Sequence, residues 1–243
     1  MFVLHRLGAS LILGIVLFSF PARAALHPAP TSSFLDGLVW QLCIPQMLPD
    51  AVVENYLFAI YEATPKIDKT GDFTWKDAYA AQLVGMDRKT FVIGGVEAKF
   101  KRALYCMFRA MEANGIKAGI TSAFRNNFRQ FIAGGQRNAP GETYHGGDKV
   151  TLGYGYGIAV DIVSLHGSTR AEQLASNPVV WKWIDRNGEL FGVGRPYLDR
   201  DAPHVTPRTS PEYAAHYLAS LRKAILAAMT KTKKKNGRHT KRQ

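Results

Sequence analysis

The stretch IKAGITSAFR, residues 116–125, joins two periodic patterns and decides how the chain folds. From Val96 to Asn114 apolar side chains recur at helical spacing, which predicts an amphipathic helix that ends at Asn114-Gly115. Residues 116–122 then alternate as a half-buried strand does. This strand therefore delivers the segment Ser122-Ala123-Phe124-Arg125 at its end.

A second strand is expected at IAVDIVSL, residues 158–165, which is an apolar run of strand length. Helices are expected on both sides of the two strands. Two are expected at residues 50–61, with Asp50 as cap, and at residues 76–84. A third is opened by the capping box Thr169-x-x-Glu172, and a fourth restarts at Asn177-Pro178 with Trp181, Ile184 and Leu190 on its buried side. A last amphipathic helix begins at Ser210-Pro211, and its apolar stripe is Ala214, Leu218, Leu221, Ile225 and Met229. Strands and helices without regular βαβ alternation predict a single α+β domain.

The first residues have the layout of a secretory signal peptide. The apolar run of residues 9–20 follows His5-Arg6 and precedes Pro21-Ala22-Arg23-Ala24, which predicts cleavage after Ala24. An uncleaved membrane anchor is the alternative, but the run is shorter than the ~18–20 apolar residues that a span needs. No later stretch is apolar enough to cross a membrane. We therefore expect residues 1–24 to be a signal peptide and the protein to be exported to the periplasm or cell envelope.

Positive charge gathers at the two ends of the 243-residue chain. Without the two arginines of residues 1–24 and the seven basic residues of 230–243, the formal charge falls from +12 to +3. The domain of residues 25–229 is thus only mildly basic, which argues against a nucleic-acid partner. The tail of residues 230–243 is predicted to be disordered. It suits either a polyanion of the envelope or a solvated segment without a partner.

The two cysteines leave one question open. Cys43 and Cys106 could form a disulfide outside the cytoplasm, or they could be two buried thiols. Their spacing does not match a zinc knuckle or a redox CxxC motif.

Histidines and carboxylates are therefore the candidates for a catalytic zinc site, which needs three side-chain ligands. Four histidines lie in unsuitable segments: His5, His27, His216 and His239. Of the remaining three, His145, His166 and His204, the second fits a structural role better. Asp161 lies inside an apolar strand, where a carboxylate needs a cation or strong hydrogen bonds.

Three motifs in order carry a family resemblance over residues 96–205. Ser122-Ala123-Phe124-Arg125 matches a Ser-Gly-Tyr-Arg strand end, and Asp201-Ala202-Pro203-His204 matches an acid-x-x-His motif. Between them, Thr143-Tyr144-His145 and Gly157-Ile158-Ala159-Val160-Asp161 match the two parts of Ser-x-His-x-x-Gly-x-Ala-x-Asp. The sequence resembles the zinc D-alanyl-D-alanine carboxypeptidases and dipeptidases of bacterial cell-wall metabolism, which share a fold with the hedgehog signalling domain.

This resemblance implies a small, mostly antiparallel sheet packed with helices, and hydrolysis of amide bonds in peptidoglycan stem peptides by a carboxypeptidase or endopeptidase. The residue roles it implies are a Zn²⁺ ion held by His145, Asp161 and His204, Asp201 as general base, Arg125 as oxyanion or substrate-carboxylate contact, and Gln130 and Ser122 in substrate binding. Segments 116–122 and 158–165 should then be neighbouring strands, because Arg125 and Asp161 must meet at one centre.

The sequence departs from the family pattern in two places. Nine residues are inserted between the histidine and glycine, and without that insertion Tyr154 would occupy the histidine position. The base is Asp201 where Glu is commoner, and Asp199 is a rival. Two other functions stay open: a non-catalytic wall- or metal-binding domain that keeps the fold, and an envelope protein that binds polyanions through its tail.

Overall fold

Four antiparallel strands form the central sheet, in the order β3-β4-β6-β5. They are β3 (Ala118–Ser122), β4 (Val160–Ser164), β6 (His204–Pro207) and β5 (Val193–Gly194). The computed structural model describes residues 43, 48–68, 71–134, 144–146, 157–198 and 200–239. Pairing of β3 with β4 confirms that the two strands expected from the sequence are neighbours.

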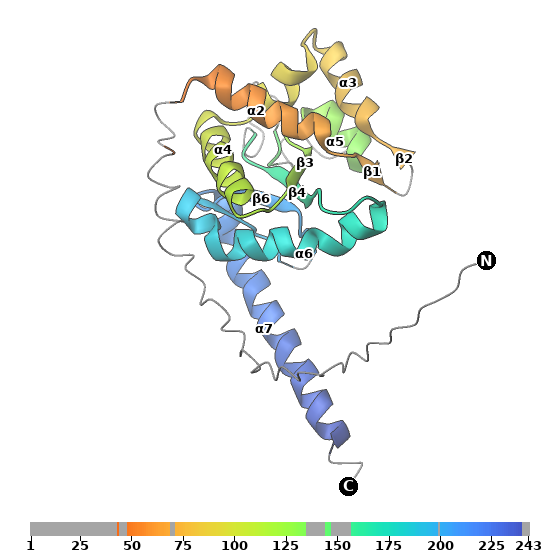
Figure 1. Cartoon of the computed structure of the whole chain (residues 1–243), viewed down its shortest axis with the longest axis vertical. Helices are drawn as coiled ribbons and strands as arrows, with labels where there is room; N and C mark the ends of the chain where they lie inside the picture. The colour runs from red at the N-terminus through yellow and green to blue at the C-terminus, as the bar shows by residue number, and fades with distance from the viewer. Residues whose placement is uncertain are drawn as a thin grey trace, which may run out of the picture.

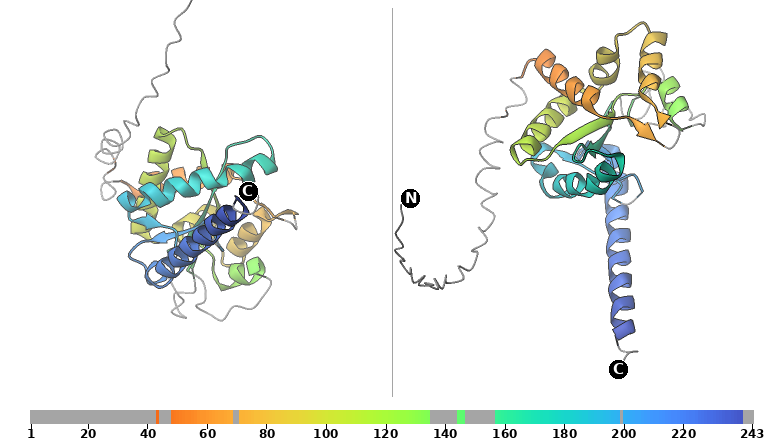
Figure 2. Two further views of the ribbon diagram at one scale, coloured as in Figure 1. Left: turned by 90° about the horizontal axis from the view of Figure 1, so that it is seen from below. Right: turned by 45° about the vertical axis from the view of Figure 1, so that its right-hand side comes forward.

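Helices surround the sheet (Figures 1 and 2). They are α2 (Asp50–Ala63), α3 (Thr74–Leu83), the π-helical turn η2 (Thr90–Gly94), α4 (Ala98–Ala113), α5 (Asn127–Gly134), α6 (Arg170–Asn187), the 3₁₀ turn η3 (Gly188–Phe191) and α7 (Pro211–His239). Helix α2 packs against β3 and α6 against β4, and a small hairpin of β1 (Ile67–Asp68) and β2 (Gly71–Asp72) lies apart. The predicted α+β class, with a small antiparallel sheet, is confirmed.

The apolar stripe of α4 forms much of the core, as its spacing predicts. Phe100, Met107 and Met111 are buried, and Val96 is buried just before the helix begins. Cys106 on the same helix forms a disulfide with Cys43, so the structure favours the disulfide over two thiols.

The helix break expected at Asn177-Pro178 is wrong, because α6 continues through Pro178 without restarting. The side chain of Asn177 accepts a hydrogen bond from the Ser164 backbone N–H of β4 (2.8 Å), so it ties helix to sheet rather than capping a new helix. The capping box at Thr169 and Glu172 is present as predicted.

Two further expectations about helices are wrong. Asp50 does not cap α2, because Pro49 is the N-cap residue; Asp50 instead forms an ion pair with Arg102 of α4 (2.8 Å). Leu190, expected on a buried face, falls in the turn η3 after α6 has ended and is 46% exposed.

Helix α7 departs furthest from the sequence prediction. Its first turns pack on the body, but after Ser220 it projects away from the other elements (Figures 1 and 2). The predicted stripe faces away from the body even within the first turns, with Leu218 at 62% exposure, and it stays exposed along the projection, with Met229 at 64%. The helix also continues to His239, where a disordered tail was expected from residue 230.

The expected signal peptide, residues 1–24, lies outside the described residues. Within the part of the chain that the structure covers, no helix combines the length and apolarity that a membrane span requires.

Candidate metal centre

Three residues of the predicted site lie in one row across the sheet. Ser122 of β3 is paired with Asp161 of β4, and Asp161 is paired with His204 of β6. Directly opposed residues share a face, so the backbone register alone brings these side chains together. Strand alternation turns Asp161 away from the face of buried Val160 and Ile162, and its side chain keeps 14% exposure.

His145 reaches the same place on a short segment that is held by the residues just after β3 and just before β4. The Arg125 N–H donates to the His145 carbonyl (3.1 Å), and the Ile158 N–H donates to the Tyr144 carbonyl (3.0 Å). A side chain at Gly146 has no room, because its Cβ would lie 2.1 Å from the Arg125 carbonyl oxygen. The chain therefore enters this position closely enough to bury His145 completely beside the sheet.

Asp201 and His204 share a site because the backbone turns between them. The His204 N–H donates to the Asp201 carbonyl (3.2 Å), and the Ile162 N–H donates to the Pro203 carbonyl (2.8 Å). In an extended strand, residues three apart would point to opposite faces. The turn before β6 removes that obstacle.

Arg195 links this turn to helix α6 by hydrogen bonds. Its Nη1 donates to the Ala202 carbonyl (2.9 Å), and its Nε donates to Asp185 Oδ1 of α6 (2.9 Å). Because Arg195 is buried, the link joins the turn that carries Asp201 to a packed helix.

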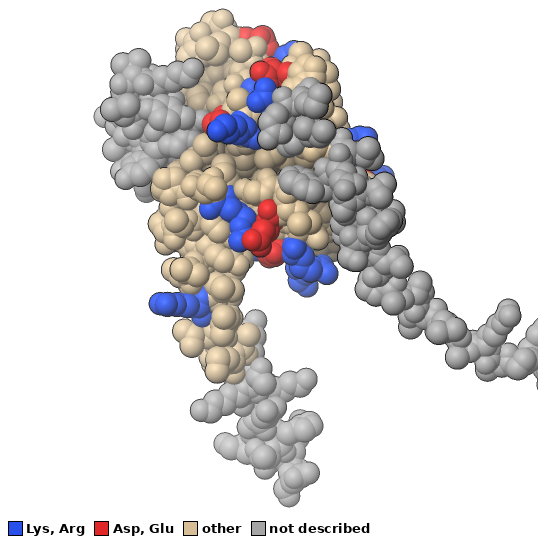
Figure 3. Space-filling model, turned by 90° about the vertical axis from the view of Figure 1, so that its left-hand side faces the viewer, with Lys and Arg blue, Asp and Glu red and all other residues tan. Residues whose placement is uncertain are grey.

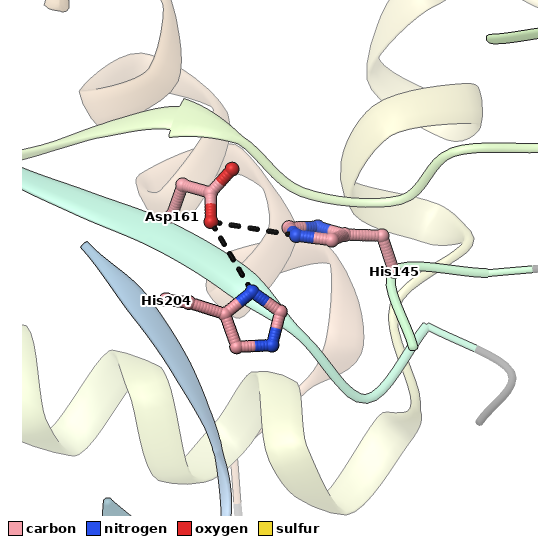
Figure 4. Close-up of side chains that lie close together, drawn as sticks. All are labelled: His145, Asp161 and His204. Carbon is pink, nitrogen blue, oxygen red and sulfur yellow. Dashed lines mark ion pairs between the residues drawn. The ribbon is translucent and has the colours of Figure 1, made fainter. Parts of the chain in front are cut away.

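The three candidate ligands converge (Figure 4). His145 Nε2 lies 3.4 Å from Asp161 Oδ1, and His204 Nδ1 lies 3.5 Å from the same oxygen. One ligand atom from each residue lies within 4.8 Å of the other two. Ligand atoms on a tetrahedral zinc are about 3.3 Å apart, as follows from bonds of ~2.0–2.2 Å. Two nitrogens and one carboxylate oxygen at these separations fit a zinc ion.

Each histidine also has an acceptor at its other ring nitrogen. His145 Nδ1 lies 2.8 Å from the Ala123 carbonyl oxygen, and His204 Nε2 lies 2.9 Å from Glu212 Oε1. The second contact is close but poorly aligned for a hydrogen bond, so it is best described as an ion pair. Metal-ligating histidines usually have such outer partners, which fix the tautomer that presents a lone pair to the metal.

Charge in the site is unevenly shared. Burial, with the Arg125 guanidinium nearby, lowers the pKa of His145 to about 4 and keeps its ring neutral. Burial would raise the pKa of Asp161, but His145 and Arg125 hold it well below its usual range. Burial would lower the pKa of His204, but the nearby Asp161 and Glu212 carboxylates raise it to about 10. A bound cation would take the place of the His204 proton beside Asp161.

Asp201 lies at the edge of the set. Its Oδ2 is 3.8 Å from His204 Nδ1, and its side chain is 52% exposed. Burial and the charge of Asp161 raise its pKa. The carboxylate thus borders the centre without belonging to the three converging ligands. The rival Asp199 lies outside the described residues, as do Tyr154 and Tyr156.

Arg125 donates hydrogen bonds to the two remaining predicted residues, Ser122 and Gln130, and to Asp161. Its Nη2 donates to Asp161 Oδ2 (2.5 Å), its Nε to Ser122 Oγ (2.7 Å) and its Nη1 to Gln130 Oε1 (3.2 Å). Asp161 therefore offers one oxygen to the two histidines and the other to Arg125. The geometry brings Ser122, Arg125 and Gln130 together, and their part in substrate binding stays a prediction.

Sequence analysis missed three residues beside the centre. Glu212 contacts His204, the Tyr197 ring centre lies 5.5 Å from that of His204, and Arg195 holds the preceding turn. No local pattern indicates these roles, because an acid in a first helical turn and an arginine in a loop are ordinary surface features. Glu212 reaches the centre because the start of α7 packs against β6, and Arg195 reaches it because α6 lies beside the turn before β6.

Comparisons with known proteins give a partial match. No family model and no curated protein matches this chain. Solved structures do match this chain, among them the following three. Two are of the vancomycin-resistance D,D-pentapeptidase VanY, one a mutant in complex with Zn(II) and one in complex with D-alanine-D-alanine. The third is the LdcB LD-carboxypeptidase, in a study of peptidoglycan recognition.

The similarity to these structures is low and covers about half of the chain. Identity is 18% and 19% for the two VanY structures and 19% for LdcB, with TM-scores of 0.34, 0.33 and 0.36. The matches cover 46%, 46% and 53% of this chain, and 72%, 71% and 64% of the respective structures.

Proposed function

We propose that this protein is a zinc-dependent peptidase that hydrolyses amide bonds in peptidoglycan stem peptides outside the cytoplasm. One observation carries the proposal: His145, Asp161 and His204 converge with separations that suit zinc, and both histidines already have acceptors at their outer nitrogens. The predicted signal peptide, residues 1–24, supports export.

Zn²⁺ held by these three residues would supply a Lewis acid and make a nearby water more acidic. Asp201 is the group placed to take the proton of the attacking water, because its carboxylate borders the ligands. As the new C–O bond forms and the amide C–N bond breaks, Asp201 returns that proton to the leaving amine. Water is consumed and the products are a carboxylate and an amine.

Arg125 would bind either the developing oxyanion or a substrate carboxylate. Its Nη1 and Nη2 each carry a second N–H beyond the bonds to Gln130 and Asp161, and its side chain keeps 15% exposure. Ser122 and Gln130 hold the guanidinium in place. A substrate that ends in a carboxylate, such as a peptide ending in D-alanyl-D-alanine, suits this arrangement.

Metal content together with turnover tests the proposal. Purified protein should bind one zinc per chain and release D-alanine from a stem peptide ending in D-alanyl-D-alanine, and a chelator should stop the release. His204→Ala should lose zinc and turnover, whereas His166→Ala, at an exposed histidine away from the site, should keep both. A cross-linked peptide tested in parallel separates endopeptidase from carboxypeptidase activity.

A non-catalytic binding domain makes a different prediction for the same experiment. It would bind zinc and wall peptide and leave both peptides intact. Protein without stoichiometric zinc, or turnover that survives in His204→Ala, would contradict the peptidase proposal.

The projecting part of α7 supports a second proposal, that it attaches the enzyme to an anionic envelope surface. No acidic residue follows Glu212 in the sequence, and the described part of the projecting helix shows uncharged and basic side chains in Figure 3. Leu218, Ile225 and Met229 are exposed on the same helix. This combination suits the interface of an anionic lipid bilayer. Binding to vesicles containing phosphatidylglycerol, lost on neutral vesicles or after removal of residues 230–243, would support it; equal binding to both vesicles would contradict it.

A further inference from the structure

The first turn of α7 places a buried carboxylate against the candidate metal centre. Ser210 opens the helix, and its Oγ accepts a hydrogen bond from the Tyr213 N–H (3.1 Å). Glu212 follows as the second helical residue and is 1% exposed. A carboxylate so deeply buried costs stability unless it has a charged or hydrogen-bonding partner.

The partner is the outer nitrogen of His204. Glu212 Oε1 lies 2.9 Å from His204 Nε2, on the opposite side of the ring from Asp161. Glu212 Oε2 is buried and makes no hydrogen bond within the described part of the chain. The ion pair with His204 thus partners this buried carboxylate, and the Tyr197 side chain interacts with it as well.

The two ring nitrogens of His204 thus have separate tasks. A neutral imidazole carries its proton on one nitrogen and a lone pair on the other. An acceptor at Nε2 favours the proton there, which leaves the lone pair on Nδ1, the nitrogen that faces Asp161. The Tyr197 ring lies beside the same imidazole, with the two ring centres 5.5 Å apart.

We propose that Glu212 is a positioning residue that fixes the Nδ1-ligating tautomer and the ring orientation of His204. The inference rests on the proposed zinc site and adds to it. His145 has a backbone carbonyl in the equivalent place, so only His204 depends on a side chain that can be removed. The start of α7 is accordingly part of the metal centre.

Zinc affinity of Glu212→Gln tests this assignment without using activity. Outer partners of metal-bound histidines are typically worth ~10–100-fold in metal affinity. We expect Glu212→Gln to bind zinc about 10- to 100-fold more weakly in competition with a chromogenic chelator. Glu189→Gln is the matched control, because that side chain is 73% exposed and faces Arg208; it should bind zinc as the wild type does.

Other readouts separate positioning from simple loss of folding. Thermal unfolding of the metal-free proteins reports whether Glu212→Gln is folded at the assay temperature, and Glu212→Ala gives the larger change if it folds. In zinc-loaded wild type, nitrogen NMR should show the His204 proton on Nε2. Wild-type zinc affinity in folded Glu212→Gln, or a proton on Nδ1, would overturn the assignment alone. Absence of zinc from the wild type would overturn the proposed function as well.

Discussion

The two ends of α7 share one continuous helix and differ in what surrounds them. At the start, Glu212 and Tyr213 are buried, and Glu212 touches the candidate metal centre. Beyond Ser220 the helix projects from the body, with Ile225 and Met229 exposed. The contrast shows that an apolar stripe indicates a face that a helix could bury, while the rest of the fold decides which face and which length are covered.

The largest effect is expected at Asp201, which borders the candidate metal centre that the start of α7 contacts. Asp201→Asn keeps the size of the side chain and removes its basicity, so zinc and fold should be retained while kcat falls ~10²–10⁴-fold. Asp199→Asn, two residues away, is the matched control and should change kcat little. Normal turnover in Asp201→Asn with a collapse in Asp199→Asn would move the base to Asp199.

Substitutions at two methionines compare how much the core and the projecting helix contribute to the free energy of unfolding. Met111 of α4 is fully buried and Met229 of α7 is 64% exposed. Met111→Ala should lower the free energy of unfolding by ~2–5 kcal/mol, because it leaves a cavity. Met229→Ala should change it by less than ~0.5 kcal/mol. Equal losses in denaturant titrations would mean that the outer part of α7 is covered in solution.

Arg195 tests how strongly the turn must be held. Arg195→Ala removes the bonds to the Ala202 carbonyl and to Asp185, so the Asp201 carboxylate loses its fixed place. A displacement of about 1 Å can cost ~10²-fold in rate, so we expect kcat to fall by up to that factor with zinc still bound. A change confined to KM, or loss of zinc, would contradict a role in holding the base.

The smallest effect is expected from shortening the chain after Met229. All residues of the proposed site lie before that point, and the helix beyond it leaves the body. A protein ending at Met229 should turn over a small soluble peptide at the wild-type rate. A large loss of turnover in a folded truncated protein would show that the removed segment enters the site.

Helix α4 and the two strands β3 and β4 could be predicted because their signals are local. The apolar spacing of α4 and the strands flanking Ser122 and Asp161 come directly from sequence periodicity. The motifs placed His145 and His204 near them through the resemblance. Glu212 and Arg195 could not be predicted, because their partners come from elements that meet only in the folded chain.

The expected break at Pro178 illustrates the other limit. Proline removes one backbone N–H, and the packing of α6 on β4, with the bond from Asn177 to Ser164, outweighs that local loss. Local propensity therefore identified Asn177 and Pro178 as special positions, but the helix break that it predicts there does not occur.

A crystal structure of zinc-loaded protein, with anomalous scattering measured at the zinc edge, tests the central claim most directly. The account predicts one zinc per chain, bound by His145 Nε2, Asp161 Oδ1 and His204 Nδ1 at ~2.0–2.2 Å. A zinc site that excludes His204, or one in which Tyr154 or Tyr156 replaces His145, would contradict it.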